Sequence, residues 1–183
     1  AIIHLENKTI ELETVTDYPY EGLIKFNLKT AGEYEICLRI PAWSSNKWSI
    51  MVNGEKVQTE VKDVFAHLKR AWNTGDTILL ELDFEPKRVY ANPKVSKDVG
   101  KVAIQCGPLV YCLEEDNGKG LQRIYLPKDS ELQLERRTDK LLGINEIHTK
   151  GYRLKELEDE TVLYASDTNW EYEPVDLTYI PYY

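Results

Sequence analysis

The sequence predicts an all-β protein that consists of two consecutive antiparallel β-sandwich domains of jelly-roll-like type. Three observations support this fold class: apolar and polar residues alternate along most of the chain, turn-forming residues separate the alternating segments, and helical periodicity is scarce. The 183 residues are enough for one large domain or two small ones. With 42% hydrophobic residues, the chain can form a core without a metal or disulfide staple.

The first half of the chain is expected to form strands at residues 24–28, 34–40, 48–52 and 78–84, where apolar side chains occupy every second position. Asn53-Gly54 follows the third of these segments and is the strongest short hairpin signal in the sequence. Together these elements predict an antiparallel sheet with tight turns.

The segment 62–72 fits either a short amphipathic helix or a strand. Val64, Ala66 and Leu68 alternate with polar residues, and the segment leads directly into a hairpin turn at residues 74–76. A strand is therefore the favoured prediction.

The second half is expected to contain strands at 102–104 and 109–113, on either side of the turn Gly107-Pro108. Weaker strands are expected at 124–126, 132–134, 162–165 and 175–180, and a loop or single helical turn at 154–161. Residues 85–100 carry two prolines and little periodicity. The predicted domains are therefore 1–90 and 91–183.

The net charge of −8 and the pI near 5.0 argue against binding to nucleic acid or to an anionic membrane surface. No apolar run approaches the roughly 20 residues of a membrane span. The chain begins without Met and ends on an aromatic run, so we expect a fragment at both ends. These features leave the cellular compartment undetermined.

Three cysteines and three histidines are the candidates for metal or redox chemistry. Because Cys37, Cys106 and Cys112 are odd in number and form no CxxC motif, buried thiols that act as small hydrophobic residues are expected. The histidines are far apart and lack metal-ligand spacing, so surface or strand-edge positions are expected for each of them: His4, His67 and His148.

Acidic and aromatic residues are the candidates for a carbohydrate site. Glu114, Glu115 and Asp116 would have to face one another across a sugar to act as glycosidase carboxylates, and a solvated loop is the favoured interpretation. Exposed Trp rings can stack on sugars, and Trp43 and Trp170 lie at a strand end and in a polar loop. Trp48 and Trp72 fit the core alternation better.

Five segments carry a specific combination of motifs: TDYPYEG (16–22), LRIPAWSSNKWSIMVNGEKV (38–57), RAWNTGDTILLELDFEPKRVYANPKV (70–95), GKVAIQCGPLVYCLEEDN (100–117) and LTYIPYY (177–183). In order and spacing they resemble the C-terminal half of glycoside hydrolase family 127, the beta-L-arabinofuranosidase family. The resemblance covers most of residues 14–117 and the last seven residues, and it is loose over 118–176.

The resemblance implies an N-terminal (α/α)6 barrel, outside this chain, followed by two β-sandwiches. In such enzymes the barrel carries a cysteine nucleophile, bound with further cysteines and a glutamate to zinc, and a glutamate acid/base. The adjacent Cys-Cys pair that marks this site is absent from the sequence. No catalytic or metal residue is therefore carried over, and zinc is expected only in the catalytic domain. Cys106 stands where relatives carry Arg, and its role is unexplained.

The resemblance implies that this chain is the non-catalytic β-sandwich portion of a retaining glycoside hydrolase that acts on plant-type, arabinose-containing glycans. Its partner would be the catalytic barrel of the same polypeptide, and the chain alone would neither hydrolyse an arabinofuranoside nor retain stoichiometric zinc. The resemblance also implies that the first sandwich, residues 1–90, lacks its first strand or two, and a missing edge strand would favour homodimers. Two alternatives stay open: a carbohydrate-binding module that binds oligosaccharide through Trp43 or Trp170, and a stand-alone interaction or adhesion domain.

Overall fold

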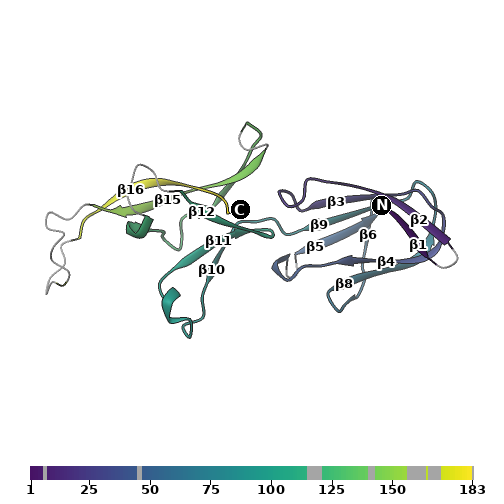
Figure 1. Ribbon diagram of the computed structural model, residues 1–183, viewed down its shortest axis with the longest axis horizontal. Helices are drawn as coiled ribbons and strands as arrows, with labels where there is room; N and C mark the ends of the chain where they lie inside the picture. The colour runs from purple at the N-terminus through teal and green to yellow at the C-terminus, as the bar shows by residue number, and fades with distance from the viewer. Residues whose placement is uncertain are drawn as a thin grey trace. The chain divides into compact units, whose positions relative to one another are not determined.

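The computed structural model describes residues 1–5, 8–44, 47–114, 121–139, 143–155, 164 and 170–182. Within these residues the chain is built from β-strands and three short 3-10 helices, and all strand pairs described are antiparallel (Figure 1). The predicted fold class is confirmed. In this part of the chain no helix has the length and apolar character needed to cross a membrane.

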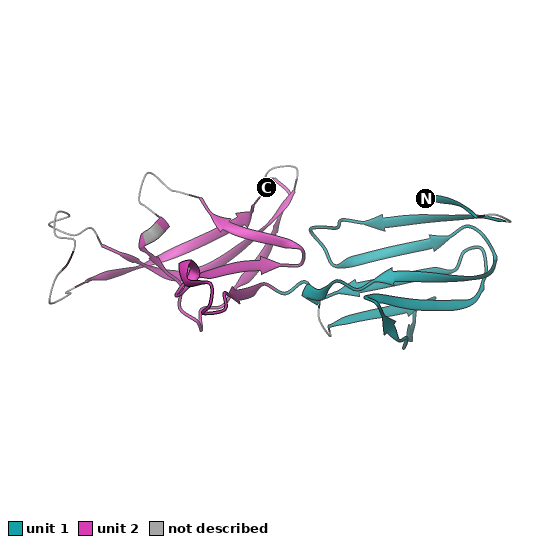
Figure 2. Ribbon diagram, turned by 60° about the horizontal axis from the view of Figure 1, so that its bottom comes forward, with its two compact units in different colours: residues 1–85 teal, residues 86–183 magenta. Residues whose placement is uncertain are grey.

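The chain divides into two compact units between Glu85 and Pro86, rather than at residue 90 (Figure 2). Strand β10 (Lys87–Tyr90) pairs along its whole length with β11 (Val102–Cys106), which explains why residues 87–90 belong to the second unit. Residues 85–100, from which the boundary was predicted, therefore largely form the connection between these two strands, within the second unit.

The first unit consists of two sheets that share one core. Its six-stranded sheet has the order β1-β2-β3-β9-β5-β6, and its three-stranded sheet has the order β4-β8-β7. The elements are β1 (Ile2–Leu5), β2 (Lys8–Thr16), β3 (Leu23–Leu28), β4 (Gly32–Arg39), η1 (Ala42–Ser44), β5 (Trp48–Val52), β6 (Glu55–Val57), β7 (Val61–Lys62), β8 (Phe65–Trp72) and β9 (Thr77–Leu82).

The core of the first unit forms from the alternate apolar residues of both sheets, as the period of two predicts. Trp72 is 2% exposed, and its indole N–H donates a hydrogen bond of 3.1 Å to the backbone carbonyl of Tyr34. A buried Trp usually needs such a partner for its N–H. The β4–β8 pairing thus fixes both the core and the outward-facing residues of the same strands.

Two tight turns with positive φ angles connect neighbouring strands of the first unit. Asn53 and Gly54 have φ angles of 53° and 83°, the signs that a two-residue hairpin turn requires. Asp63 and Val64 form the equivalent turn between β7 and β8, with φ angles of 49° and 66°. The strand prediction is correct for residues 65–72, but not for the turn at Asp63 and Val64, which was not expected because a β-branched residue disfavours positive φ.

The second unit is a seven-stranded antiparallel sheet with the order β10-β11-β12-β16-β15-β13, in which β14 also pairs with β15. The sheet therefore branches at β15, whose first half pairs with β14 and whose second half pairs with β13. The further elements are η2 (Ser96–Asp98), β12 (Leu109–Leu113), η3 (Leu121–Arg123), β13 (Ile124–Tyr125), β14 (Gln133–Arg137), β15 (Ile144–Leu154) and β16 (Tyr172–Pro181).

Strand β15 is the longest strand described and was not expected from the sequence. Its burial does not alternate, because Asn145, Glu146 and Thr149 are buried together with Ile144 and Ile147. Strand predictions from alternating apolar residues fail for a central strand with buried polar groups. Most of the expected strand at 162–165 and most of the expected loop at 154–161 lie outside the described residues, and Tyr164, which is described, is in no strand.

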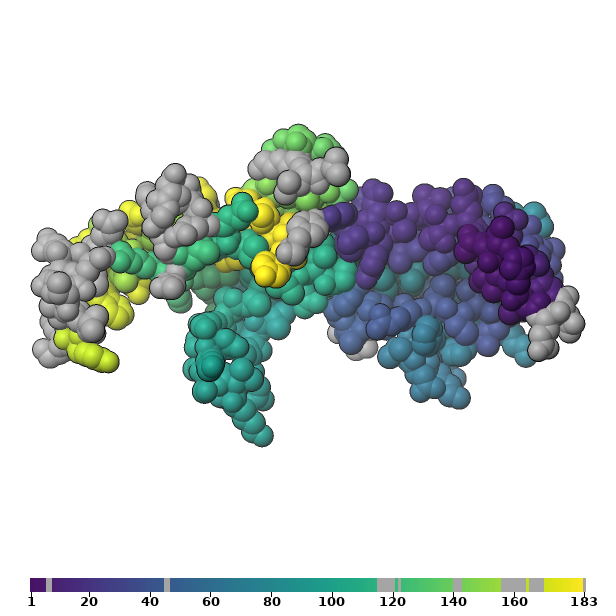
Figure 3. All heavy atoms as spheres, in the orientation of Figure 1, coloured from purple at the N-terminus to yellow at the C-terminus, as the bar shows by residue number. Residues whose placement is uncertain are grey.

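The end of β10 and its connection to β11 form an arm of the second unit, residues 89–101, in which every residue is exposed. In Figure 3 it stands out as a teal lobe. The arm is ordered by its own hydrogen bonds, including those from the backbone N–H of Val95 to Asn92 and from that of Asp98 to Val95. Val95 and Val99 nevertheless have 48% and 63% of their surface exposed.

Candidate functional site

The two tryptophans proposed for sugar stacking differ in exposure. Trp43 lies in η1 and is partly buried; it packs against the core of the first unit, with its ring edge-on to Phe84 at 6.2 Å. Trp170, just before β16 in the second unit, is 53% exposed. Of the two, Trp170 therefore presents the larger accessible ring surface.

A hollow lined by three tyrosines lies on the sheet of the second unit, and sequence reasoning did not find it. Tyr125 and Tyr152 are cross-strand partners on β13 and β15, with ring centroids 6.5 Å apart, and Tyr172 opens β16. All three side chains are exposed, and they line an open hollow of about 370 Å³. Only the pairing of β13 and β16 with the unexpected strand β15 brings them together.

The two cysteines near the Gly107-Pro108 turn are structural. Cys106 is fully buried and Cys112 is half-buried. Because Cys106 pairs with Leu109 across the turn, Cys112 lies on the opposite face of the sheet. Burial, followed by the nearby charge of Glu114, raises the pKa of the Cys112 thiol. A redox cysteine needs a lowered thiol pKa, so Cys112 does not fit that role.

The acidic cluster offers no carboxylate pair within the described residues. Glu114 is exposed at the end of β12, whereas Glu115 and Asp116 lie outside the described residues. The general acid of a glycosidase needs a carboxyl group that is shielded from water, and Glu114 lacks that shielding.

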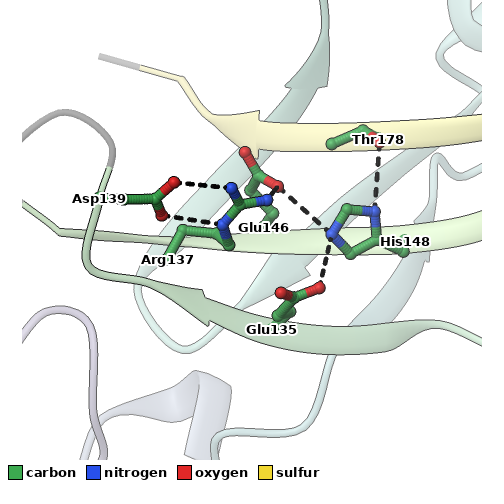
Figure 4. A network of polar contacts seen from close by, with 6 residues as sticks. All are labelled: Glu135, Arg137, Asp139, Glu146, His148 and Thr178. Carbon is green, nitrogen blue, oxygen red and sulfur yellow. Dashed lines mark hydrogen bonds and ion pairs between the residues drawn. The ribbon is translucent and has the colours of Figure 1, made fainter.

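The most buried charged group described is Glu146 on β15, which is 1% exposed (Figure 4). Nη1 of Arg137 lies 3.4 Å from one of its oxygens, and Arg137 also donates to both oxygens of Asp139 at 2.8 and 3.0 Å. The pKa of Arg137 is raised, first by its hydrogen bonds to Asp139. The guanidinium thus remains charged and neutralises a carboxylate that water does not reach.

His148 completes this network. Its Nε2 lies 3.3 Å from an oxygen of Glu135 and 3.3 Å from one of Glu146, close enough for ion pairing but without hydrogen-bond alignment. Its Nδ1 lies 3.2 Å from the hydroxyl of Thr178 on β16. These contacts join β14, β15 and β16, so the network holds the branched sheet together.

The network carries a pair of facing carboxylates, because Glu135 and Glu146 are cross-strand partners. A glycosidase needs such a pair on the walls of a sugar-binding cleft. The adjoining cavity, of about 380 Å³, is lined by His148 and Thr149 but by neither carboxylate. We therefore assign the pair to the stability of the sheet.

A cluster of three potential metal ligands, Glu35, Cys37 and His67, lies on the outer face of the β4–β8 pair in the first unit. Nδ1 of His67 is 3.5 Å from Sγ of Cys37 and 3.3 Å from Oε1 of Glu35, and the ligand atoms all lie within 4.8 Å of one another. Cys37 is exposed, so the prediction that it is a buried thiol is wrong. It occupies the outward face of β4, opposite the core residues Tyr34 and Leu38.

Comparison with known proteins assigns each unit to a described domain. Residues 1–84 match the domain described as "Beta-L-arabinofuranosidase, GH127 middle domain". Residues 86–183 match the "Glycoside hydrolase family 127 C-terminal domain".

Relatives of known name and structure are longer than this chain. A non-reducing end beta-L-arabinofuranosidase of Bifidobacterium longum subsp. longum is 32% identical over 95% of this chain and 28% of its own length. The crystal structure of a GH127 beta-L-arabinofuranosidase from Geobacillus stearothermophilus T6 has a TM-score of 0.90 and 33% identity over 100% of this chain and 29% of its own. A GH127 beta-arabinofuranosidase structure has a TM-score of 0.86 and 30% identity over 100% and 30%. The chain thus spans less than a third of these relatives.

Proposed function

Because the chain belongs to glycoside hydrolase family 127, we propose that it forms the two accessory β-domains of a beta-L-arabinofuranosidase-like enzyme whose catalytic groups lie elsewhere in the polypeptide. In this proposal the partner is a helical catalytic barrel, which also carries the catalytic zinc. The substrates of the whole enzyme would be arabinofuranosides of plant-type glycans.

The observation that carries this proposal is the extent of the match. The chain corresponds to domains described as middle and C-terminal, and it covers 28% and 29% of two beta-L-arabinofuranosidases. Among the described residues, the facing carboxylates Glu135 and Glu146 lie against His148 within the sheet, and Glu146 also forms an ion pair with Arg137. A supporting role fits these features better than catalysis does.

The exposed arm of residues 89–101 is the best candidate for contact with the catalytic domain. It contains the whole motif VYANPKV (89–95), on which the family resemblance partly rests, yet its residues are all exposed. Val89, Tyr90, Val95 and Val99 are all exposed on it. Burial of a Val side chain contributes about 1.5–3 kcal/mol, so this arm could add appreciable stability to a domain interface.

Hydrolysis by the purified chain tests the assignment directly. We expect no turnover of an aryl β-L-arabinofuranoside by the 183-residue chain, while a polypeptide that includes the barrel turns it over. Release of the aryl group by the pure chain, in proportion to its concentration, would show that the catalytic groups lie within these two units after all.

Substitutions on the arm test the supporting role in the polypeptide that includes the barrel. Val95→Asp and Val99→Asp should lower the thermal stability of the catalytic domain, because each places a charge in an apolar interface. Val110→Asp is the matched control, since Val110 is 50% exposed on β12 and lies outside the arm. If all three variants behave alike, the arm is not a docking element.

A second candidate function, binding of oligosaccharide, is favoured by the tyrosine hollow and by the exposed ring of Trp170. Aromatic rings on an exposed sheet offer apolar faces to sugar rings. Titration with arabinan oligomers should quench Trp170 fluorescence, and Tyr152→Ala should abolish the response while Trp43→Phe retains it. No response at millimolar oligosaccharide would remove this candidate.

A further inference from the structure

Three side chains of different ligand type meet on the outer face of the first unit. Glu35 and Cys37 are two residues apart on β4 and therefore share a face. Cys37 is the direct cross-strand partner of His67 on β8. Eight consecutive residue pairs hold these two strands in register, so the backbone positions of all three side chains are fixed before any ligand binds.

The three ligand atoms lie within 4.8 Å of one another. Sγ of Cys37 and Oε1 of Glu35 both approach the same nitrogen, Nδ1 of His67, at 3.5 and 3.3 Å. A catalytic Cys-His-acid relay needs the thiol and the carboxylate on different ring nitrogens, because one nitrogen carries at most one proton. The arrangement therefore does not fit a relay, and it fits three ligands around a common centre.

Two of the three ligand–ligand distances, both measured from Nδ1 of His67, agree with those around a tetrahedral ion. Zinc binds sulfur at about 2.3 Å, imidazole nitrogen at about 2.0–2.1 Å and carboxylate oxygen at about 2.0–2.2 Å. From these lengths, two ligands at a tetrahedral angle lie about 3.5 Å apart for sulfur and nitrogen, and about 3.3 Å apart for nitrogen and oxygen. The observed separations, 3.5 Å and 3.3 Å, match both values.

From this geometry we propose that Glu35, Cys37 and His67 bind a divalent transition-metal ion, of which zinc fits best. A thiolate with an imidazole selects zinc or cobalt over magnesium and calcium, which prefer oxygen ligands. Three protein ligands leave a fourth position for water. The side chains of Glu35 and His67 are 44% and 36% exposed, so the ion would exchange readily with solution.

The proposal is independent of the supporting role proposed above, since the catalytic zinc of such enzymes is expected in another domain. It departs from the expectation that no residue of this chain binds a metal. Lys69, the cross-strand partner of Glu35, places a competing cation nearby, which also favours an exchangeable site over a permanently occupied one.

The test uses the 183-residue chain. Bound metal is removed with a chelator, the cysteines are reduced with a reagent that contains no thiol, and the chain is then titrated with Co²⁺. We expect one equivalent to produce a thiolate-to-cobalt absorption band together with the intense visible band of four-coordinate cobalt, and Zn²⁺ to displace both. Zn²⁺ should also slow alkylation of Cys37 but not of Cys112, which lies in the other unit.

Variants identify the ligands. Cys37→Ser and His67→Gln should weaken Zn²⁺ binding by more than about 100-fold, since even the loss of a group outside the ligand shell costs roughly 10–100-fold. Glu35→Gln should weaken it less, because the amide oxygen can still coordinate. Cys112→Ser and His4→Gln are matched controls and should bind as the unaltered chain does.

Folding of the variants is measured separately from binding. The ligand side chains are exposed or half-exposed, so circular dichroism of the metal-free variants should equal that of the unaltered chain. The proposal is overturned if no saturable thiolate band appears at millimolar Co²⁺. It is equally overturned if binding survives Cys37→Ser, or if the control variants lose binding to the same extent.

Discussion

Replacement of Arg137 by Met should destabilise the second unit far more than the loss of an exposed cation would. Met keeps much of the length and the apolar stem of Arg137 but removes the guanidinium that lies 3.4 Å from the carboxylate of Glu146. The carboxylate itself stays in place, and Glu146 is 1% exposed. The substitution therefore leaves a buried charge without its guanidinium partner.

The magnitude follows from the surroundings of the pair. Loss of one partner of a buried ion pair costs about 3–5 kcal/mol. Arg137 has 28% of its side chain exposed, and His148 still faces Glu146, so the lower end applies and we expect about 3 kcal/mol. With an m-value of about 1.5 kcal/mol per molar urea, the midpoint of unfolding would fall by roughly 2 M.

Urea unfolding followed by far-ultraviolet circular dichroism measures this loss. Because the chain has two units, the two transitions are analysed separately, and only the one assigned to the second unit should move. Addition of Glu146→Gln to Arg137→Met removes the buried charge, and the total loss should fall to about 1 kcal/mol. Lys128→Met, which replaces an exposed cation, is the control and should change little.

Two results would refute this reasoning. A loss within about 0.5 kcal/mol for Arg137→Met would mean that the carboxylate does not depend on the guanidinium, as for a surface pair. A double variant less stable than the single one would mean that Glu146 stabilises the sheet by another contact than its charge pairing.

Two further predictions concern the first unit. Gly22→Ala should cost about 1–3 kcal/mol in urea unfolding, because its added Cβ would lie 2.4 Å from the backbone oxygen of Leu82; an unchanged midpoint would show that the two segments separate freely. Hydrogen bonds from Asn73 N–H and then Asn53 hold the pKa of Asp76 below its ordinary 3.8, so the folded state takes up the proton less readily than the unfolded state. The stabilisation by ionised Asp76 is complete above pH 3.8 and is lost as the pH falls through the lowered pKa. Asp76→Asn should therefore reduce the loss of unfolding free energy at acid pH. If Asp76→Asn loses as much stability at acid pH as the unaltered chain does, other groups are responsible for that loss.

Alternation of apolar residues was sufficient to predict most strands of the first unit, because its two sheets bury one face each against a common core. The same rule failed for β15. Buried Glu146 and Thr149 break the apolar pattern there, and the burial of Glu146 is compensated by partners on other strands that no local sequence pattern reveals.

The cluster of Glu35, Cys37 and His67 could not be predicted from the sequence for a related reason. His67 is 30 residues from Cys37, and only the β4–β8 register makes them neighbours. The rule of local metal-ligand spacing therefore excluded a local motif but could not test a site assembled by the fold. Cys37 itself sits at a position of β4 that alternates with Tyr34 and Leu38, so its outward direction could have been inferred from the strand pattern alone.

Strand β15 also links two places that would otherwise be treated separately. His148 and Tyr152 both belong to the continuous ladder that β15 forms with β16, so we expect the strands that carry the ion-pair network and the tyrosine hollow to open as one cooperative unit. A ligand in the hollow would then slow amide exchange at His148, and weakening of the network would lower the apparent affinity of the hollow by the fraction of molecules in which the ladder is open. The affinity of the tyrosine hollow for a ligand would in this way report on how well the part of β15 around His148 is folded.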